Sequence, residues 1–163
     1  MFNNIRKPFC QKLCDKYDEP ARNFVKKFYN DLGIKAIDNH DKYGVDLILL
    51  RDNIKVGYAE VEVCVGWNSP MYPFKTYHVP LRKGKFFNLD MPTEFWAVSN
   101  TFSRALHIDG NVILESPQVI VPNKYVLSNE RFYEIELNLM QRYNKGLLIS
   151  LEEVKLDCLM PQY

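Results

Sequence analysis

The chain has 163 residues, of which 47% are hydrophobic and 13% aromatic, and its formal net charge is +1 at pH 7. This composition suits a single compact domain with a hydrophobic core and excludes an intrinsically disordered chain. A net charge near zero means that any basic surface must be concentrated in one region. No apolar run reaches the length of a membrane span, and the N-terminal residues lack the apolar core of a signal peptide. We therefore expect a soluble, cytoplasmic protein without a membrane partner.

Four cysteines stand at positions 10, 14, 64 and 158. They form no Cys-x-x-Cys pair, and no histidine lies beside them at the spacing of a zinc site. We interpret them as free thiols in a reducing compartment rather than as metal ligands or disulfide partners.

The N-terminal region has the pattern of two helices followed by a short strand. Apolar residues recur at helical spacing on both sides of Pro20, which suits the first position of the second helix. Asp18 or Glu19 would cap that helix, and Gly33 would end it. The apolar run at 34–37 then predicts a strand.

Residues 43–64 have the pattern of a β-hairpin with its turn at 51–53. Side chains alternate between the faces of a strand, so Glu60 and Glu62 share one face of the second strand and the other face is aliphatic. With the turn midway, Asp46 on the first strand comes opposite Glu60 or the residue before it. Grouping three carboxylates costs free energy unless a cation neutralises them, so the hairpin predicts a divalent metal site.

A half-exposed antiparallel strand shows the same alternation, so Glu60 and Glu62 also fit a surface role, facing water beside Lys42 or Lys55. Asp46 argues against this alternative, because it interrupts an apolar run in which an unpartnered carboxylate is disfavoured. Both interpretations predict the hairpin, but only the first predicts a site.

Several short strands are expected beyond the hairpin, and the large aromatic residues Trp67 and Trp96 are interpreted as core or rim residues. The runs that predict strands are 94–99, 105–108, 119–121 and 133–137, and 138–145 has the pattern of a helical turn. No repeat, low-complexity tract or linker divides the chain.

This order of elements, with Asp46 on one hairpin strand and Glu60 on the next, resembles the PD-(D/E)XK nuclease superfamily of restriction-endonuclease-like and Holliday-junction-resolvase-like enzymes. The superfamily has an α-β-β-β-α-β core and the signature Asp, then (Asp/Glu)-x-Lys. The resemblance implies an α/β fold with a restriction-endonuclease-like core, in which helices flank a central mixed β-sheet. It covers about residues 19–110 of a single domain spanning 1–163, with 111–163 as a C-terminal elaboration.

Glu62 stands where the superfamily signature has lysine. Some restriction endonucleases of the superfamily carry Glu-x-Glu at this place, as this chain does. An alternative alignment on Glu62-Val63-Cys64 puts cysteine there instead. The resemblance further implies a metal-ligating acid on the first helix, and Glu19 matches it in order along the chain, although a helix cap explains Glu19 equally well.

Residues 75–87 are the most basic stretch of the chain and directly follow the acidic hairpin. Tyr77, Phe86 and Phe87 are interleaved with the cations, a combination that suits phosphate contacts and base stacking. A solvated connector anchored by its aromatic rings fits the same pattern. A lysine of this stretch, a role we assign to Lys75, would supply the positive charge that Glu62 does not. The candidates for binding nucleic acid are Lys75, His78, Arg82, Lys83 and Lys85.

We therefore predict a Mg²⁺-dependent endonuclease acting on DNA, with RNA left open as a substrate. Asp46 and Glu60 would ligate the ion, for which Mn²⁺ would substitute, and Glu62 would act as a general base or complete a second metal position. Superfamily members often cut two strands as homodimers, so the resemblance also implies a possible homodimer. The alternatives are an inactive nuclease-fold protein that binds nucleic acid or serves as a scaffold, and an ordinary interaction module.

Overall fold

The computed structural model describes residues 11–121, 130–144 and 147–149. Within them the helices are α1 (Gln11–Asp31) and α2 (Gly110–Leu114), with the 3₁₀ helices η1 (Leu81–Phe87) and η2 (Leu137–Leu139). The strands are β1 (Lys35–Asp38), β2 (Leu47–Arg51), β3 (Ile54–Cys64), β4 (Thr76–Pro80), β5 (Thr93–Ser99), β6 (Arg104–Asp109), β7 (Gln118–Ile120), β8 (Arg131–Glu136), β9 (Gln141–Asn144) and β10 (Leu147–Ile149).

The strands form two sheets. The larger has the order β1-β2-β3-β5-β6-β9-β10, and it is mixed because β3 and β5 run parallel while the other neighbours are antiparallel. The smaller sheet is antiparallel and has the order β4-β8-β7. The predicted α/β class with a central mixed sheet and flanking helices is confirmed. The C-terminal residues also contribute to the larger sheet, because β9 pairs with β6.

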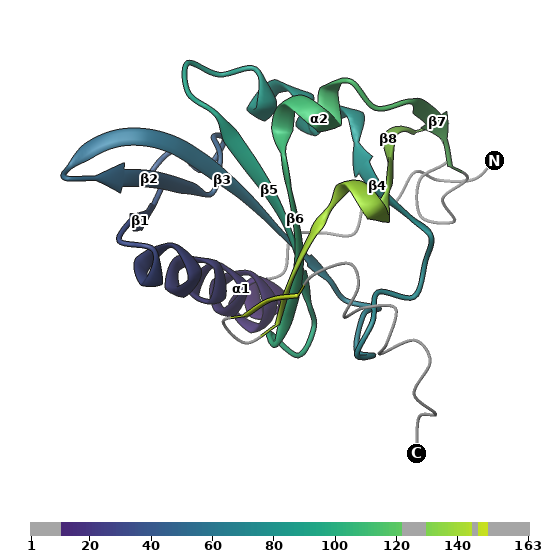
Figure 1. The fold of residues 1–163 in the computed structure, drawn as a ribbon, viewed down its shortest axis with the longest axis horizontal. Helices are drawn as coiled ribbons and strands as arrows, with labels where there is room; N and C mark the ends of the chain where they lie inside the picture. The colour runs from purple at the N-terminus through teal and green to yellow at the C-terminus, as the bar shows by residue number, and fades with distance from the viewer. Residues whose placement is uncertain (1–10, 122–129, 145–146, 150–163) are drawn as a thin grey trace.

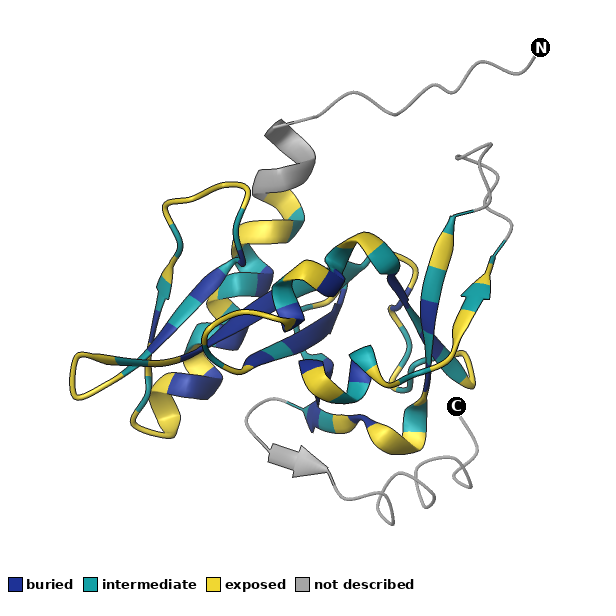
Figure 2. Cartoon of the chain, turned by 90° about the horizontal axis from the view of Figure 1, so that it is seen from above, coloured by how far each residue is buried: buried dark blue, intermediate teal, exposed yellow. Residues whose placement is uncertain are grey.

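The larger sheet lies between two layers (Figure 1). Helix α1 packs on one face, where Trp96 and Val98 of β5 join its core. The alternate residues Phe95 and Ala97 enter a second core, formed with η1, α2 and the smaller sheet. The buried residues run through the centre of the molecule in Figure 2. Because β5 is buried on both faces, its central residues 95–98 form a continuous apolar run.

Helix α1 corrects the prediction of two helices. It runs unbroken through Pro20, which is therefore neither a helix start nor preceded by a cap at Asp18 or Glu19. A proline inside a helix removes one backbone hydrogen bond, but the apolar residues that follow it on α1, among them Ala21, Val25 and Phe28, are buried in the core and outweigh that loss. Gly33 ends the helical segment as predicted: its φ is +77°, and the next amide, of Ile34, donates to the carbonyl of Tyr29.

The hairpin and its turn are confirmed, but β2 begins at Leu47, so Asp46 lies just before the strand and not on it as predicted. Asp52 and Asn53 have φ values of 51° and 62°, the left-handed conformation that a two-residue hairpin turn requires at both positions. A bulge between Leu49 and Leu50 shifts the register, which then places Leu47 opposite Ala59. Leu47 faces α1, whereas the turn and the bulge together set Asp46 at the level of Glu60.

The later strands follow the predicted positions, with two differences. The predicted strands at 94–99, 105–108, 119–121 and 133–137 correspond to β5, β6, β7 and β8. The predicted helical turn at 138–145 is wrong: η2 ends at Leu139 and β9 follows, because pairing with β6 overrides the local pattern. Strand β4 and helix α2 were not predicted.

We expect Asn53→Gly to raise the free energy of unfolding by about 0.5 kcal/mol, because glycine adopts a positive φ without a Cβ penalty. Asn53→Val should lower it by about 1 kcal/mol or more, since a β-branched residue is strained there. Urea denaturation of the two variants and the parent protein measures both changes. Equal stability of all three proteins would contradict the role of this turn.

Candidate active site

The site lies where β2 and β3 separate. Strand β3 continues to Cys64, but its pairing with β2 ends at Ala59, so the next residues have a sheet neighbour only in β5. The amide of Val61 donates instead to Asp46 Oδ2 at 2.8 Å. The Asp46 carboxylate therefore takes the place of a strand neighbour, and this bond fixes it beside Glu60.

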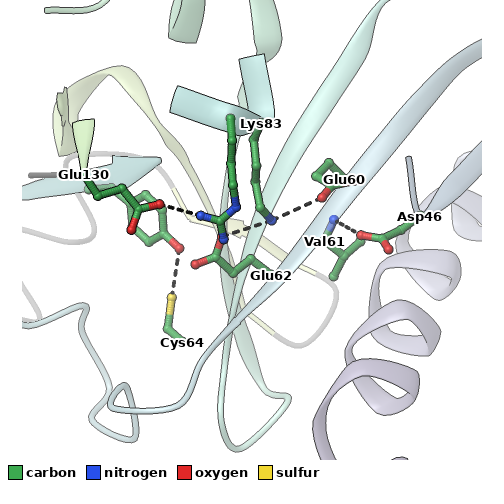
Figure 3. A network of polar contacts seen from close by, with 9 residues as sticks. Asp46, Glu60, Val61, Glu62, Cys64, Lys83 and Glu130 are labelled. Carbon is green, nitrogen blue, oxygen red and sulfur yellow. Dashed lines mark hydrogen bonds and ion pairs between the residues drawn. The ribbon is translucent and has the colours of Figure 1, made fainter. Parts of the chain in front are cut away.

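Lys83 of η1 reaches Glu60 and Glu62 from the face of the larger sheet that is opposite α1 (Figure 3). Its Nζ lies 3.1 Å from Glu60 Oε1 and 3.2 Å from Glu62 Oε2. Glu60 and Lys83 are mostly buried, with 8% and 16% of their side chains exposed. The interpretation in which Glu60 faces water beside Lys42 or Lys55 is therefore wrong, and Lys55 pairs with Asp90 instead.

Burial and like charge act together on the carboxylates. Burial raises the pKa of Glu60 from 4.5 to about 7, and the neighbouring charge of Asp46 adds to that rise against the opposing effect of Lys83. Burial also raises the pKa of Asp46, although the hydrogen bond from Val61 works against the rise. Near neutral pH, Glu60 is therefore poised between its protonated and ionised forms.

Lys83 keeps its proton despite its burial. Burial lowers the pKa of a lysine, but the charges of Glu62 and Glu60 outweigh that effect and leave the pKa above its ordinary value. Its Nζ also lies 5.6 Å from the centre of the Phe95 ring, where a cation is attracted to the ring face. A fixed ammonium group is therefore part of the site.

The carboxylates suit a divalent cation. Glu60 Oε2 is buried and accepts no hydrogen bond from any described residue, although a carboxylate oxygen in that position needs a partner. When ionised, Asp46, Glu60 and Glu62 carry three negative charges against the single charge of Lys83. Within the described residues, no three Asp, Glu, His or Cys side chains are grouped as a ready ligand set. Mg²⁺ commonly binds through one or two carboxylates plus waters and substrate phosphates, so Asp46 and Glu60 are the residues that could hold it.

A cavity of about 730 Å³ opens on the α1 side of Asp46. Asp18 and Arg22 of α1 line it together with the loop that precedes β2. Glu19 is exposed and is not among the lining residues, so Asp18 is the α1 acid nearer to Asp46. A helix starting at Pro20 left Asp18 only the part of a possible cap, so its position beside Asp46 was not predicted. A continuous helix places Asp18 and Arg22 on one face, four residues apart.

The predicted basic residues separate into different roles. Lys83 carries the positive charge at the acids, the role that we assigned to Lys75. Lys75 is exposed on the loop before β4 and lines a second cavity, next to Glu62. His78 Nε2 lies 2.9 Å from Glu134, and Arg82 pairs with Glu130, so both have protein partners. The remaining candidate, Lys85, is exposed and lies over the Phe86 ring.

The aromatic residues among those cations mostly anchor the segment. Tyr77 and Phe87 are buried in the second core, and Phe86 packs against it. Trp67 and Trp96 are also buried, as predicted for core residues. The prediction that Tyr77 and Phe87 stack on bases is therefore wrong, because neither ring presents a face to solvent.

Cys64 argues against the alignment that places it at the lysine position. Its Sγ lies 3.3 Å from the hydroxyl of Tyr77, and burial raises the pKa of the thiol to about 12. A neutral thiol supplies no positive charge. Among the four cysteines, only Cys64 has a described side chain, and it is a free thiol; residues 10 and 158 lie outside the described residues.

No protein-family model matches the sequence, and no curated protein matches it. In the described part of the chain, no helix is both long and apolar enough to span a membrane. The geometry and chemistry of the site are therefore the basis for assigning a function.

The raised pKa of Glu60 predicts a stability that depends on pH. Between pH 4.5 and about 7, the folded protein holds this proton more tightly than the unfolded chain does, so the free energy of unfolding falls as pH rises through this range. Glu60→Gln replaces the titratable carboxyl group with an amide that does not ionise. We expect the variant to be more stable than the parent at pH 8, by on the order of 1 kcal/mol, and the difference to shrink at pH 5.

Urea denaturation in metal-free buffer at pH 5 and pH 8 measures this difference, with Glu136→Gln, an exposed residue, as the matched control. If the parent protein instead gains stability relative to Glu60→Gln as pH rises, the Glu60 pKa is not raised by burial.

Proposed function

We propose that this chain is a Mg²⁺-dependent endonuclease that hydrolyses phosphodiester bonds in DNA and has the restriction-endonuclease-like core of the PD-(D/E)XK superfamily. The observation that carries the proposal is the position of Lys83, whose ammonium group bridges Glu60 and Glu62. It places a positive charge beside the acids even though residue 62 is a glutamate.

The arrangement of the elements supports the proposed core. Helix α1 is followed by the strands β1, β2 and β3, and a crossover leads to β5, which runs parallel to β3. This order follows the α-β-β-β-α-β pattern, with β4 and η1 in the crossover where the pattern has a helix. Lys83 lies on η1 and thus reaches the site from the element that replaces that helix.

Asp46 and Glu60 would hold the ion. When bound, Mg²⁺ would lower the pKa of an attacking water and neutralise charge on the phosphate. Lys83 would stabilise the negative charge that develops on the phosphate oxygens, since its proton is firmly held. Glu62 would also position the Lys83 ammonium, and its partial exposure leaves it open to solvent as a proton acceptor.

We expect the protein to cleave plasmid or branched DNA only with Mg²⁺ or Mn²⁺, and Asp46→Asn to lower the rate by about 100-fold or more. Asparagine retains an oxygen that accepts the Val61 hydrogen bond, so the fold should persist. Asp31→Asn, at the exposed end of α1, is the matched control. Gel assays of cleavage with and without EDTA measure the effect.

Cleavage that persists in Asp46→Asn would refute the proposal. Salt-dependent DNA binding without cleavage in the parent protein would instead support an inactive nuclease-fold protein.

The position of the positive charge can be tested by moving it. Lys83→Met should lower cleavage by about 100-fold or more and also destabilise the protein, because it leaves two partly buried carboxylates without their cation. Adding Glu62→Lys in the same chain removes one carboxylate and restores the lysine of the superfamily signature. We expect the double variant to recover at least part of both stability and cleavage.

Thermal unfolding and cleavage rates should be measured on the single and double variants together. Recovery of stability without any recovery of cleavage would show that Lys83 has only a structural role.

A further inference from the structure

A second cavity, of about 560 Å³, adjoins the candidate active site on the side away from Asp46. Glu62 belongs to both, since its carboxylate pairs with Lys83 and also lines the cavity. The other walls come from the end of β3, the loop at 65–75 and the start of β4. A group held in this cavity would therefore lie next to a phosphate at the site.

The cavity has an aromatic wall centred on Tyr72. The centre of its ring lies 5.5 Å from that of Trp67, 5.6 Å from that of Phe74 and 5.5 Å from that of Tyr77. Trp67 and Tyr77 are each only 3% exposed and form the base of the wall. Phe74 is 66% exposed and Tyr72 is half-buried, so these two rings are accessible to a ligand.

The loop that carries these rings is held in place by the sheet. The amide of Trp67 donates to the carbonyl of Cys64 at 2.9 Å, and the amide of Asn100 donates to the carbonyl of Trp67 at 2.9 Å. The side chain of Asn100 also donates to the carbonyl of Val65 at 2.7 Å. These bonds attach the start of the loop, at the base of the cavity, to the turn after β5.

Resting on the proposed nuclease function, we propose that this cavity holds one unpaired nucleobase of the substrate, stacked on Phe74 and Tyr72, next to the phosphate at the acid site. Aromatic rings bind any base through its π-face, and exposed Lys75 on the cavity wall is placed to contact a phosphate. A base in a duplex must first be unpaired and unstacked, at a cost in free energy that an unpaired base does not have, before it can enter such a cavity. The substrate class would therefore be single-stranded DNA or a branched DNA with an unpaired nucleotide.

An organic cation such as trimethyl-lysine is the other ligand that an aromatic wall suggests. Three observations favour the base. Lys75 on the wall repels a cation, the carboxylate of Glu62 is already paired with Lys83, and Trp67 and Tyr77 are too buried to offer ring faces on several sides.

The test measures binding separately from cleavage. A single-stranded oligonucleotide containing 2-aminopurine, whose fluorescence is quenched by stacking, is titrated with the full chain in EDTA. We expect quenching and binding, and a loss of affinity of about 5-fold or more in Phe74→Ala, as for the loss of one base-stacking contact. Phe74→Leu, which keeps an apolar side chain without a ring, should also lose the quenching. Ile54→Ala is the control, since Ile54 at the hairpin tip is 68% exposed.

The second measurement is cleavage with Mg²⁺ of oligonucleotides that carry an abasic nucleotide at each position in turn. At one position near the cut, the abasic substitution should slow the parent protein and have little further effect on Phe74→Ala. Additive losses at every position would overturn the assignment of a base to this cavity.

The outcomes separate the two proposals. Cleavage that needs Asp46 but is indifferent to Phe74, with equal affinity for single strands and blunt duplex, would overturn the base-binding cavity and leave the nuclease standing. Quenching that depends on Phe74 without any metal-dependent cleavage would support the cavity and overturn the nuclease. Binding of a trimethyl-lysine peptide but not of the oligonucleotide would overturn the cavity assignment.

Discussion

The burial of Lys83 between Glu60 and Glu62 is the constraint on which the rest of the site depends. A buried ammonium group without partners is costly, and so are two carboxylates held close together without a cation. Each group is therefore tolerated only because the others are present. Because Lys83 lies on η1 and the glutamates lie on β3, their ion pairs also fix the crossover segment against the larger sheet.

Strand β3 serves both the core and the site because its side chains alternate. Val61 and Val63 pack toward α1, whereas Glu60 and Glu62 point to the opposite face and meet Lys83. Past Ala59 the strand has no partner in β2, which leaves room for the carboxylate of Asp46 at its edge. A strand paired on both sides would leave no such opening.

The hairpin was predictable because its signals are local. Alternation along β2 and β3 follows from the two-residue period of a strand, and the turn at Asp52-Asn53 has residues that tolerate a positive φ. The break at Pro20 was a local signal too, but α1 continues through the proline, and the apolar residues that follow it are buried in the core. Tertiary structure also decides the residues after η2: their local pattern indicates a helical turn, but pairing with β6 makes them strand β9.

The sequence by itself determined the α/β class, the hairpin and the shared face of Glu60 and Glu62, because these depend on composition and on periods of a few residues. Only the tertiary structure decided which cation meets those acids. Lys83 lies 23 positions beyond Glu60, and its side chain reaches the site because the crossover packs back over β3. No local pattern distinguishes it from Lys75 or Lys85, since the distinction lies in burial and in the charges that burial brings together.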